Sequence, residues 1–113
     1  METTHEEARI ARTENIFRHV NERIAETAEL FGSEETEFVC ECADANCQHR
    51  LEVPLDEYDE IRDDGTHFLI AHGHEEPGYE RVLKQRRGYS IVEKFRRRLA
   101  AAVRRTDPRA DTP

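Results

Sequence analysis

Residues 37–47 read Glu-Phe-Val-Cys-Glu-Cys-Ala-Asp-Ala-Asn-Cys, a strand-like alternation followed by a polar turn. Side chains at positions i and i+2 of a strand point to the same face, so Cys40 and Cys42 can direct both sulfurs to one point. The turn at 43–46 then brings Cys47 back toward them. Three thiolates within eight residues supply three corners of a tetrahedron. The segment therefore predicts a zinc knuckle within the fold.

A histidine can complete a three-cysteine zinc site, and four histidines compete for that position. They are His49, His67, His72 and His74. His74 is favoured because residues 72–74 (His-Gly-His) follow a predicted strand that should pair near the cysteine strand. Gly73 also gives the backbone the freedom to turn an imidazole inward. His49 ranks second and His72 third. We therefore expect one zinc ion per chain, held by the three cysteines and His74.

Other interpretations of the cysteine cluster stay open. Free cysteine is often a small core residue, and a cluster can also be redox-active or hold an iron–sulfur centre. The neighbours Glu41, Asp44, Asn46 and Gln48 are too polar for a plain core strand. Three cysteines are an odd number, whereas secreted disulfide scaffolds spread an even number along the chain. Metal chemistry is therefore the preferred interpretation.

Upstream of the cysteines, residues 5–31 have the apolar periodicity of one long helix. Its apolar stripe has a spacing of seven, at Ile10, Phe17, Ile24 and Phe31. Three further apolar residues, Ile16, Val20 and Leu30, widen the stripe, while Glu and Arg fill the other faces. Thr3 or Thr4 can cap the start of the helix, and Gly32 can end it.

This stripe has two possible roles. It can pack on the sheet of its own chain, or part of it can meet another chain. A helix of this length is about 40 Å long and reaches beyond a small body, and a seven-residue spacing is typical of a two-helix seam. We therefore expect Ile10, Phe17, Ile24 and Phe31 to bind a protein partner or to mediate self-association.

The rest of the chain alternates between short strands and helices. Strands are predicted at 49–53, 67–71, 79–86 and 89–94, and helices at 55–63 and 95–105. Arg87-Gly88 suits the turn of a hairpin, and 107–113 is predicted to be a frayed tail. The expected fold class is α+β, with a long N-terminal helix, one small antiparallel sheet carrying the zinc knuckle, and a basic C-terminal helix. The expected division is 1–33, 34–95 and 96–113.

The net charge of −8 conceals a strong asymmetry. Residues 38–80 hold 12 acidic and 2 basic side chains, whereas 81–113 hold 3 acidic and 11 basic ones. The C-terminal arginines Arg96, Arg97, Arg98, Arg104 and Arg105 form a possible polyanion-binding surface. Only Phe95, Leu99 and Val103 can anchor this helix, so we expect loose docking. The acidic body predicts weak, salt-sensitive nucleic-acid binding at most.

The chain also resembles a set of small bacterial proteins, common in actinobacteria, that share a C-E-C…C…E-Y…G-H-E…V-E-K layout. The resemblance covers about residues 8–95 and is carried by 15–24, 38–42, Cys47, 55–58, Phe68, 73–75 and 89–94. The chain departs from this layout at His72, where proline is expected, and at Gly78, where an acid is expected. The resemblance implies that Cys40, Cys42, Cys47 and His74 form one site, and it implies no activity.

The length of the chain and the motifs absent from it limit the functions that can be expected. A chain of 113 residues with 37% charged side chains predicts one domain with a thin core. No apolar run suggests a membrane span or a signal peptide, so a soluble cytoplasmic protein without a membrane partner is expected. The zincin, deaminase, nucleophile-elbow and phosphate-loop motifs are absent from the sequence. We expect a non-enzymatic zinc-binding adaptor or regulator. The alternatives are a nucleic-acid-associated regulator using 81–105 and an enzyme with an open metal position.

Overall fold

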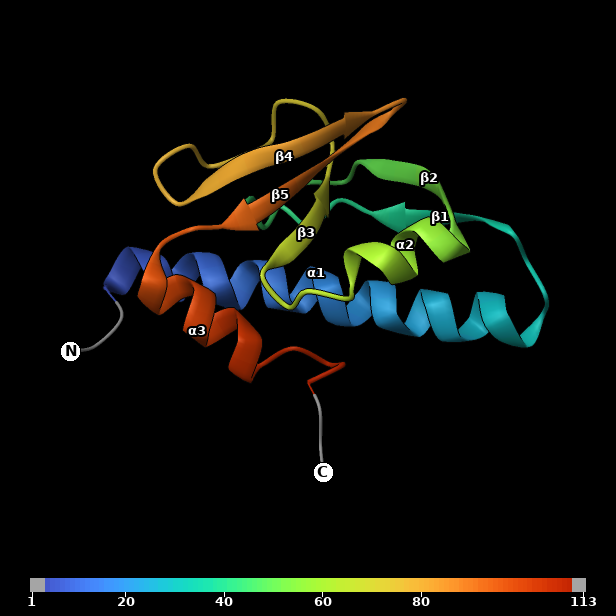
Figure 1. Cartoon of the computed structure of the whole chain (residues 1–113), viewed down its shortest axis with the longest axis horizontal. Helices are drawn as coiled ribbons and strands as arrows, with labels where there is room; N and C mark the ends of the chain where they lie inside the picture. Colours follow the sequence, from blue (N-terminus) through green and yellow to red (C-terminus); the bar gives the residue numbers. More distant parts are fainter. Residues whose placement is uncertain (1–3, 111–113) are drawn as a thin grey trace.

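The computed structural model describes residues 4–110, which form an α+β fold (Figure 1). In chain order the elements are α1 (His5–Leu30), β1 (Glu35–Val39), β2 (Arg50–Pro54), α2 (Leu55–Ile61), β3 (His67–Ile70), β4 (Glu80–Arg86), β5 (Tyr89–Lys94) and α3 (Arg97–Arg105). The order and type of the elements agree with the sequence-based prediction. Helix α1 runs along one side of the molecule, and the strands lie across it.

Helix α1 begins in a complete capping box. The Thr4 hydroxyl accepts a hydrogen bond from the Glu7 amide at 3.1 Å, and the Glu7 carboxylate accepts one from the Thr4 amide at 3.0 Å. These contacts satisfy amides that have no partner within the helix. At the other end, Gly32 adopts φ +66°, a conformation that favours glycine and ends the helix. The alternative cap, Thr3, lies outside the described residues.

The buried face of α1 differs from the predicted apolar stripe. Ile10 is fully buried, but Phe17 and Ile24 are only partly buried, and Phe31 is 80% exposed. Three polar side chains are fully buried on this face: Glu14 and Arg18, which were expected to face solvent, and Asn21, for which no position was predicted. Polar residues can occupy this face because other elements supply hydrogen-bonding or charged partners for them.

The strands divide into two antiparallel sheets, where one was predicted. β1 pairs with β2, and the other sheet has the order β3-β5-β4. The division arises at the cysteines, because the chain leaves β1 after Val39 to form the turn that carries them. The two sheets remain linked at this point, where the Glu41 amide donates to the Leu69 carbonyl at 2.7 Å. The cysteine segment therefore lies at the junction of the sheets.

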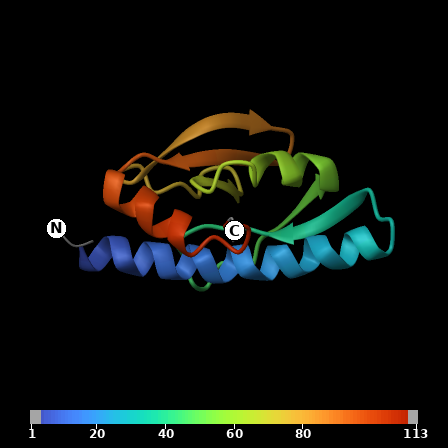
Figure 2. The ribbon, with the colours of Figure 1, turned by 60° about the horizontal axis from the view of Figure 1, so that its bottom comes forward.

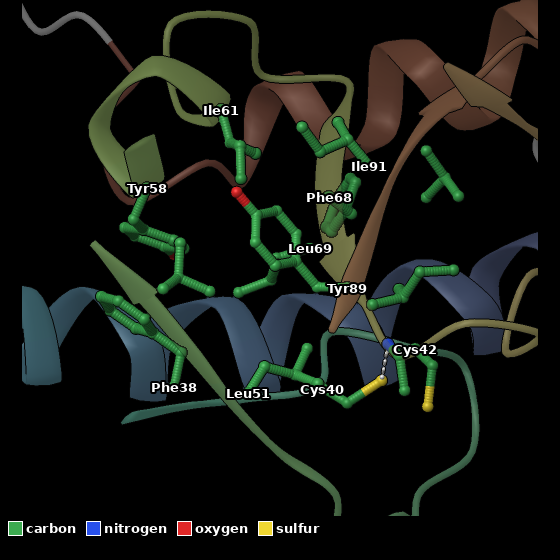
Figure 3. Packing of buried hydrophobic residues seen from close by; sticks show 14 of the residues in the cluster. Phe38, Cys40, Cys42, Leu51, Tyr58, Ile61, Phe68, Leu69, Tyr89 and Ile91 are labelled. Atoms are coloured by element: carbon green, nitrogen blue, oxygen red, sulfur yellow. Dashed lines mark hydrogen bonds between the residues drawn. The ribbon is translucent and has the colours of Figure 1, made fainter. Parts of the chain in front are cut away.

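The core lies between α1 and the two sheets, with α2 and α3 closing its sides (Figures 1 and 2). Phe38 and Tyr58 stack with ring centroids 4.2 Å apart. Cys40 and Cys42 belong to the same buried cluster and close one end of it, as Figure 3 shows. These two cysteine side chains therefore continue directly from the apolar core.

Helix α3 is packed into this core, which corrects the expectation of loose docking. Leu99 and Val103 are fully buried. The Arg18 guanidinium donates to the Val103 carbonyl at 2.5 Å, and Arg62 forms a buried ion pair with Asp107. Residues 107–110 are also held, because Arg109 pairs with Glu22 at 2.7 Å and with Asp59 at 2.9 Å. The rest of the predicted frayed tail, 111–113, lies outside the described residues.

A buried ionic cluster lies between α1 and the strand pair β4–β5. The Lys94 ammonium contacts the carboxylates of Glu14 and Glu80, and all three side chains are inaccessible to solvent. The same ammonium lies 4.4 Å from the centroid of the Phe68 ring. Burial, with a further contribution from the Glu80 charge, raises the pKa of Glu14 to about 8. Glu14 is therefore largely protonated at neutral pH in the folded protein.

None of the helices in the described part of the chain combines the length and the apolar character needed to span a lipid bilayer.

Candidate metal centre

The three cysteines lie on a short excursion between β1 and β2. Cys40 directly follows β1 and still pairs with the other strand, because its amide donates to the His49 carbonyl at 3.1 Å. The turn that follows is closed by Asp44, whose carbonyl accepts from the Cys47 amide at 3.0 Å and whose carboxylate accepts from the Asn46 amide at 2.9 Å. Backbone geometry therefore returns Cys47 toward Cys40, as the sequence predicted.

The fourth side chain comes from the loop after β3. The His74 amide donates to the Ala71 carbonyl at 3.1 Å, which closes a tight turn over 71–74. Within this turn Gly73 adopts φ +84°, a conformation that a residue with a side chain rarely takes. The turn directs the His74 imidazole back toward the cysteines.

The ligand atoms of Cys40, Cys42, Cys47 and His74 all lie within 4.8 Å of one another. His74 Nδ1 is 3.6 Å from the Cys40 sulfur and 3.6 Å from the Cys47 sulfur. Zn–S bonds of about 2.3 Å and a Zn–N bond of about 2.0 Å at tetrahedral angles place sulfur and nitrogen about 3.5 Å apart. Both distances match that value. His74 Nδ1 is equally distant from the two sulfurs. This arrangement fits a cation held between all three atoms better than a hydrogen bond from His74 to one sulfur.

Backbone amides surround the sulfurs with hydrogen-bond donors. The Ala71 amide donates to the Cys40 sulfur at 3.1 Å (Figure 3). A backbone hydrogen bond at Asp44 contributes to the lowered pKa of Cys42, and one at His49 opposes the rise that burial causes in the pKa of Cys47. Each of these two residues lies two positions after its cysteine. Such donors stabilise thiolates and orient them, as expected of the shell around a metal site.

The cysteines have different proton affinities. A hydrogen bond between Cys40 and Cys42, together with burial, raises the pKa of Cys40. The same hydrogen bond lowers the pKa of Cys42 to about 5, and the His74 side chain contributes to that lowering. Burial raises the pKa of Cys47. Cys42 is thus a thiolate at neutral pH, and a metal ion that binds here must displace protons from its neighbours.

The remaining candidate histidines have other partners. The His49 ring packs edge-on against His74 with centroids 4.5 Å apart, outside the set of four ligands. His72 Nδ1 lies 2.6 Å from the Ser90 hydroxyl. His67 Nε2 lies 3.6 Å from an Asp64 oxygen and 3.4 Å from a Glu93 oxygen. Of the four histidines considered, His74 alone joins the three cysteines.

Glu41 supports the site in a way that sequence analysis missed. Its side chain is fully buried and accepts hydrogen bonds from Asn21 Nδ2 and the Tyr58 hydroxyl, both at 2.8 Å, and from the Leu69 amide at 2.9 Å. Glu41 therefore links the cysteine turn to α1, α2 and β3. Its position between two same-face cysteines is the signal that could have placed it on the opposite, inward face.

The C-terminal arginines differ in exposure and in their contacts. Arg97, Arg104 and Arg105 are exposed, whereas Arg98 is partly buried. Arg96 is exposed, but its side chain donates to the Gly78 carbonyl at 2.7 Å and its guanidinium lies over the Tyr79 ring. Polyanion binding stays a prediction, and its exposed candidate residues within α3 are Arg97, Arg104 and Arg105.

Comparison with protein-family models, curated proteins and solved structures found no significant match.

Proposed function

We propose that this protein binds one zinc ion as a structural element, through Cys40, Cys42, Cys47 and His74. The observation that carries the proposal is the placement of His74 Nδ1 at 3.6 Å from two cysteine sulfurs, within a set of ligand atoms spanning at most 4.8 Å. Three thiolates and one imidazole form a ligand set typical of structural zinc. Iron–sulfur clusters are more often held by four cysteines, and all three cysteines here are free thiols.

The same geometry favours a non-enzymatic role. Catalytic zinc keeps one coordination position open for water or substrate, whereas four protein ligands close the site. Cys40 and Cys42 are each only 1% exposed, so they form the inner wall of the site, and Cys47 and His74 cover its outer side. Zinc held in this way would fasten the turn after β1 to the loop after β3. It would therefore stabilise the junction between the two sheets.

Metal analysis tests this proposal. Protein purified without chelators should contain about one zinc per chain, and Co²⁺ in its place should give the absorption of a tetrahedral thiolate site. Cys42→Ser and His74→Ala should each reduce zinc content, and His49→Ala is the matched control because its ring borders the site without belonging to it. Protein that neither retains nor takes up zinc contradicts the proposal. Loss of metal in His49→Ala but not in His74→Ala contradicts the ligand assignment.

We further propose that the zinc-stabilised fold acts by binding another protein, as an adaptor or regulator. The supporting observation is apolar surface left open where α1 ends: Leu30 is 84% exposed and Phe31, the next residue, 80%. Apolar side chains gathered on a monomer surface commonly mark interaction sites. Pull-down from lysate with the wild-type protein and with a Phe31→Asp variant tests this role. We expect the wild-type protein to capture a partner that the variant no longer captures.

Polyanion binding is a second candidate. Arg97 and Arg104 are seven residues apart on α3, so they share a face, and Arg105 adjoins them. All three are exposed. An Arg97→Ala/Arg104→Ala variant should lose salt-sensitive gel-shift binding of DNA or RNA, while zinc content stays unchanged. Equal binding by the variant would exclude this surface.

A further inference from the structure

A shallow apolar groove lies between the C-terminal half of α1 and β1, on residues that the zinc site does not use. It has a volume of about 620 Å³. Helix α1 contributes the apolar side chains of Val20, Ile24 and Ala28 and the polar ones of Arg23 and Thr27, and Phe31 follows directly after the helix. Residues 35–37 of β1 line the other side. Val20 is 41% exposed and Phe31 80%. Apolar side chains open to solvent are therefore placed beside the edge of a β-strand.

The hydrogen-bond pattern shows which groups of β1 face away from β2. The Cys40 amide bonds to the His49 carbonyl at 3.1 Å, so this residue pair is hydrogen-bonded across the strands. Such pairs alternate in an antiparallel ladder, which turns the backbone groups of Val39 outward. The Asn21 side chain satisfies both of these Val39 groups, each at 2.8 Å. Helix α1 thus closes the outer edge of β1 at this end of the strand.

The same alternation turns the backbone groups of Glu37 and Glu35 outward, toward the groove side of the strand. The Leu55 amide bonds to the Glu34 carbonyl at 2.8 Å, which fits this register. Within residues 4–110, no backbone group pairs with the outward groups of Glu35 and Glu37. They form a short open edge that can accept one more strand.

Charge around the groove identifies the kind of strand that fits. The groove lining holds two carboxylates, Glu35 and Glu37, and one cation, Arg23. Arg50 also lies 3.9 Å from a Glu37 oxygen. Three further exposed carboxylates, Glu26, Glu29 and Glu34, lie in the segment between these lining residues, so acidic groups outnumber basic ones around the groove. If β1 of a second copy paired with this edge, these carboxylates would lie close to like charges, which destabilises strand pairing. A strand in which Lys or Arg alternates with apolar residues can pair its charges with these carboxylates. Its apolar side chains can then contact the apolar side chains of the groove.

We propose that the groove between α1 and β1 binds an extended segment of a partner protein in which basic and apolar residues alternate. The segment adds to the edge at Glu35 and Glu37, and its apolar side chains rest on Val20, Ile24 and Phe31. This is β-strand addition, in which main-chain hydrogen bonds give affinity and alternate side chains give specificity. The proposal rests on the protein–protein interaction role proposed above and defines the partner's chemistry.

The probe is a fluorescent six-residue peptide of three Lys-Val repeats, titrated into the zinc-loaded full chain and followed by anisotropy. Binding should perturb the amide NMR signals of Glu35 and Glu37. A peptide of Glu-Val repeats should bind at least about tenfold more weakly, because it repels the acidic rim. Backbone N-methylation of the Lys-Val peptide should also weaken binding at least about tenfold, since it removes the main-chain donors.

Matched variants locate the contact. Glu35→Lys/Glu37→Lys should weaken binding at least about tenfold, whereas Glu60→Lys on α2, an exposed residue outside the groove lining, should change it less than about twofold. Phe31→Asp should weaken binding, and Leu30→Asp, which is equally exposed but lies outside the groove, should not. Zinc content should stay the same in every variant, so failure here is distinguishable from failure of the zinc site.

Three results would overturn the proposal. One is the absence of binding of the Lys-Val peptide to zinc-loaded protein. A second is equal binding of the Lys-Val and Glu-Val peptides. The third is concentration-dependent dimerisation in light scattering that Phe31→Asp abolishes and Leu30→Asp leaves intact, because it would assign the groove to a second copy of this chain.

Discussion

Replacement of Leu99 by alanine tests whether α3 belongs to the core. Leu99 is fully buried in the apolar cluster between α3 and the rest of the fold. Removing a buried leucine side chain costs about 2–5 kcal/mol, because apolar contacts are lost and a cavity remains. A domain of this size has a total stability of about 5–15 kcal/mol. One substitution in the C-terminal helix should therefore remove a large share of the stability.

Urea unfolding of the zinc-loaded protein measures the change. At about 4 °C per kcal/mol for a domain near this length, the loss corresponds to a fall of about 8–20 °C in melting temperature. The matched control is Arg97→Ala on the exposed face of the same helix, where a change within about 0.5 kcal/mol is expected. A loss below about 1 kcal/mol for Leu99→Ala would refute the argument that α3 is part of the core.

Deletion of residues 96–113 extends the same reasoning. It removes Leu99 and Val103, and it also removes the carbonyl that Arg18 uses and the carboxylate that pairs with Arg62. Arg62 would keep only Glu22, whose oxygen lies 3.7 Å from its Nε, and breaking a buried ion pair costs about 3–5 kcal/mol. The summed loss approaches the stability of the whole domain, so the truncated chain should be unfolded by circular dichroism. A truncated chain that keeps its melting temperature would contradict this expectation.

Three further outcomes follow from the same structure. Removing zinc with a strong chelator should lower the melting temperature, and adding zinc back should restore it, because metal binding is coupled to folding in small domains. Glu41→Leu should destabilise the fold by about 2–5 kcal/mol in urea unfolding, since Asn21 and other buried donors would lose their acceptor; an unchanged midpoint would show that this carboxylate is dispensable. The raised pKa of Glu14 means that the stability it contributes is complete below pH 4.5 and is lost as pH rises to about 8. Glu14→Gln should therefore flatten the pH dependence of stability across that window, while Glu80 and Lys94 remain paired, and an unaltered profile would contradict the assignment.

Local sequence signals predicted most of the elements and three of the four proposed ligands. Thr4 starts α1 through its side-chain hydrogen bond, and Gly32 ends it through its backbone conformation; both effects act within one turn. Cys40, Cys42 and Cys47 lie within eight residues, so a strand and a turn are enough to gather their sulfurs. Only the assignment of His74 depended on residues far apart in the sequence. It used the backbone freedom of Gly73 and the expectation that the preceding strand pairs near the cysteine strand.

Tertiary structure alone decided which polar residues of the helices are buried. Periodicity assigned Glu14 and Arg18 to solvent and gave no position for Asn21, because a helix pattern registers hydrophobicity and not the partners available in space. Their actual partners lie far away in the chain: Lys94 for Glu14, the Val103 carbonyl for Arg18, and Val39 for Asn21.

The docking of α3 depended on the same kind of information. Leu99 and Val103 looked like a weak anchor, but Arg18 and Arg62 reach α3 and the residues after it from elsewhere in the fold. Burial of a charged side chain is favourable only when a complementary group arrives at hydrogen-bonding distance. The packing of distant elements determines that distance, and no local sequence pattern specifies it.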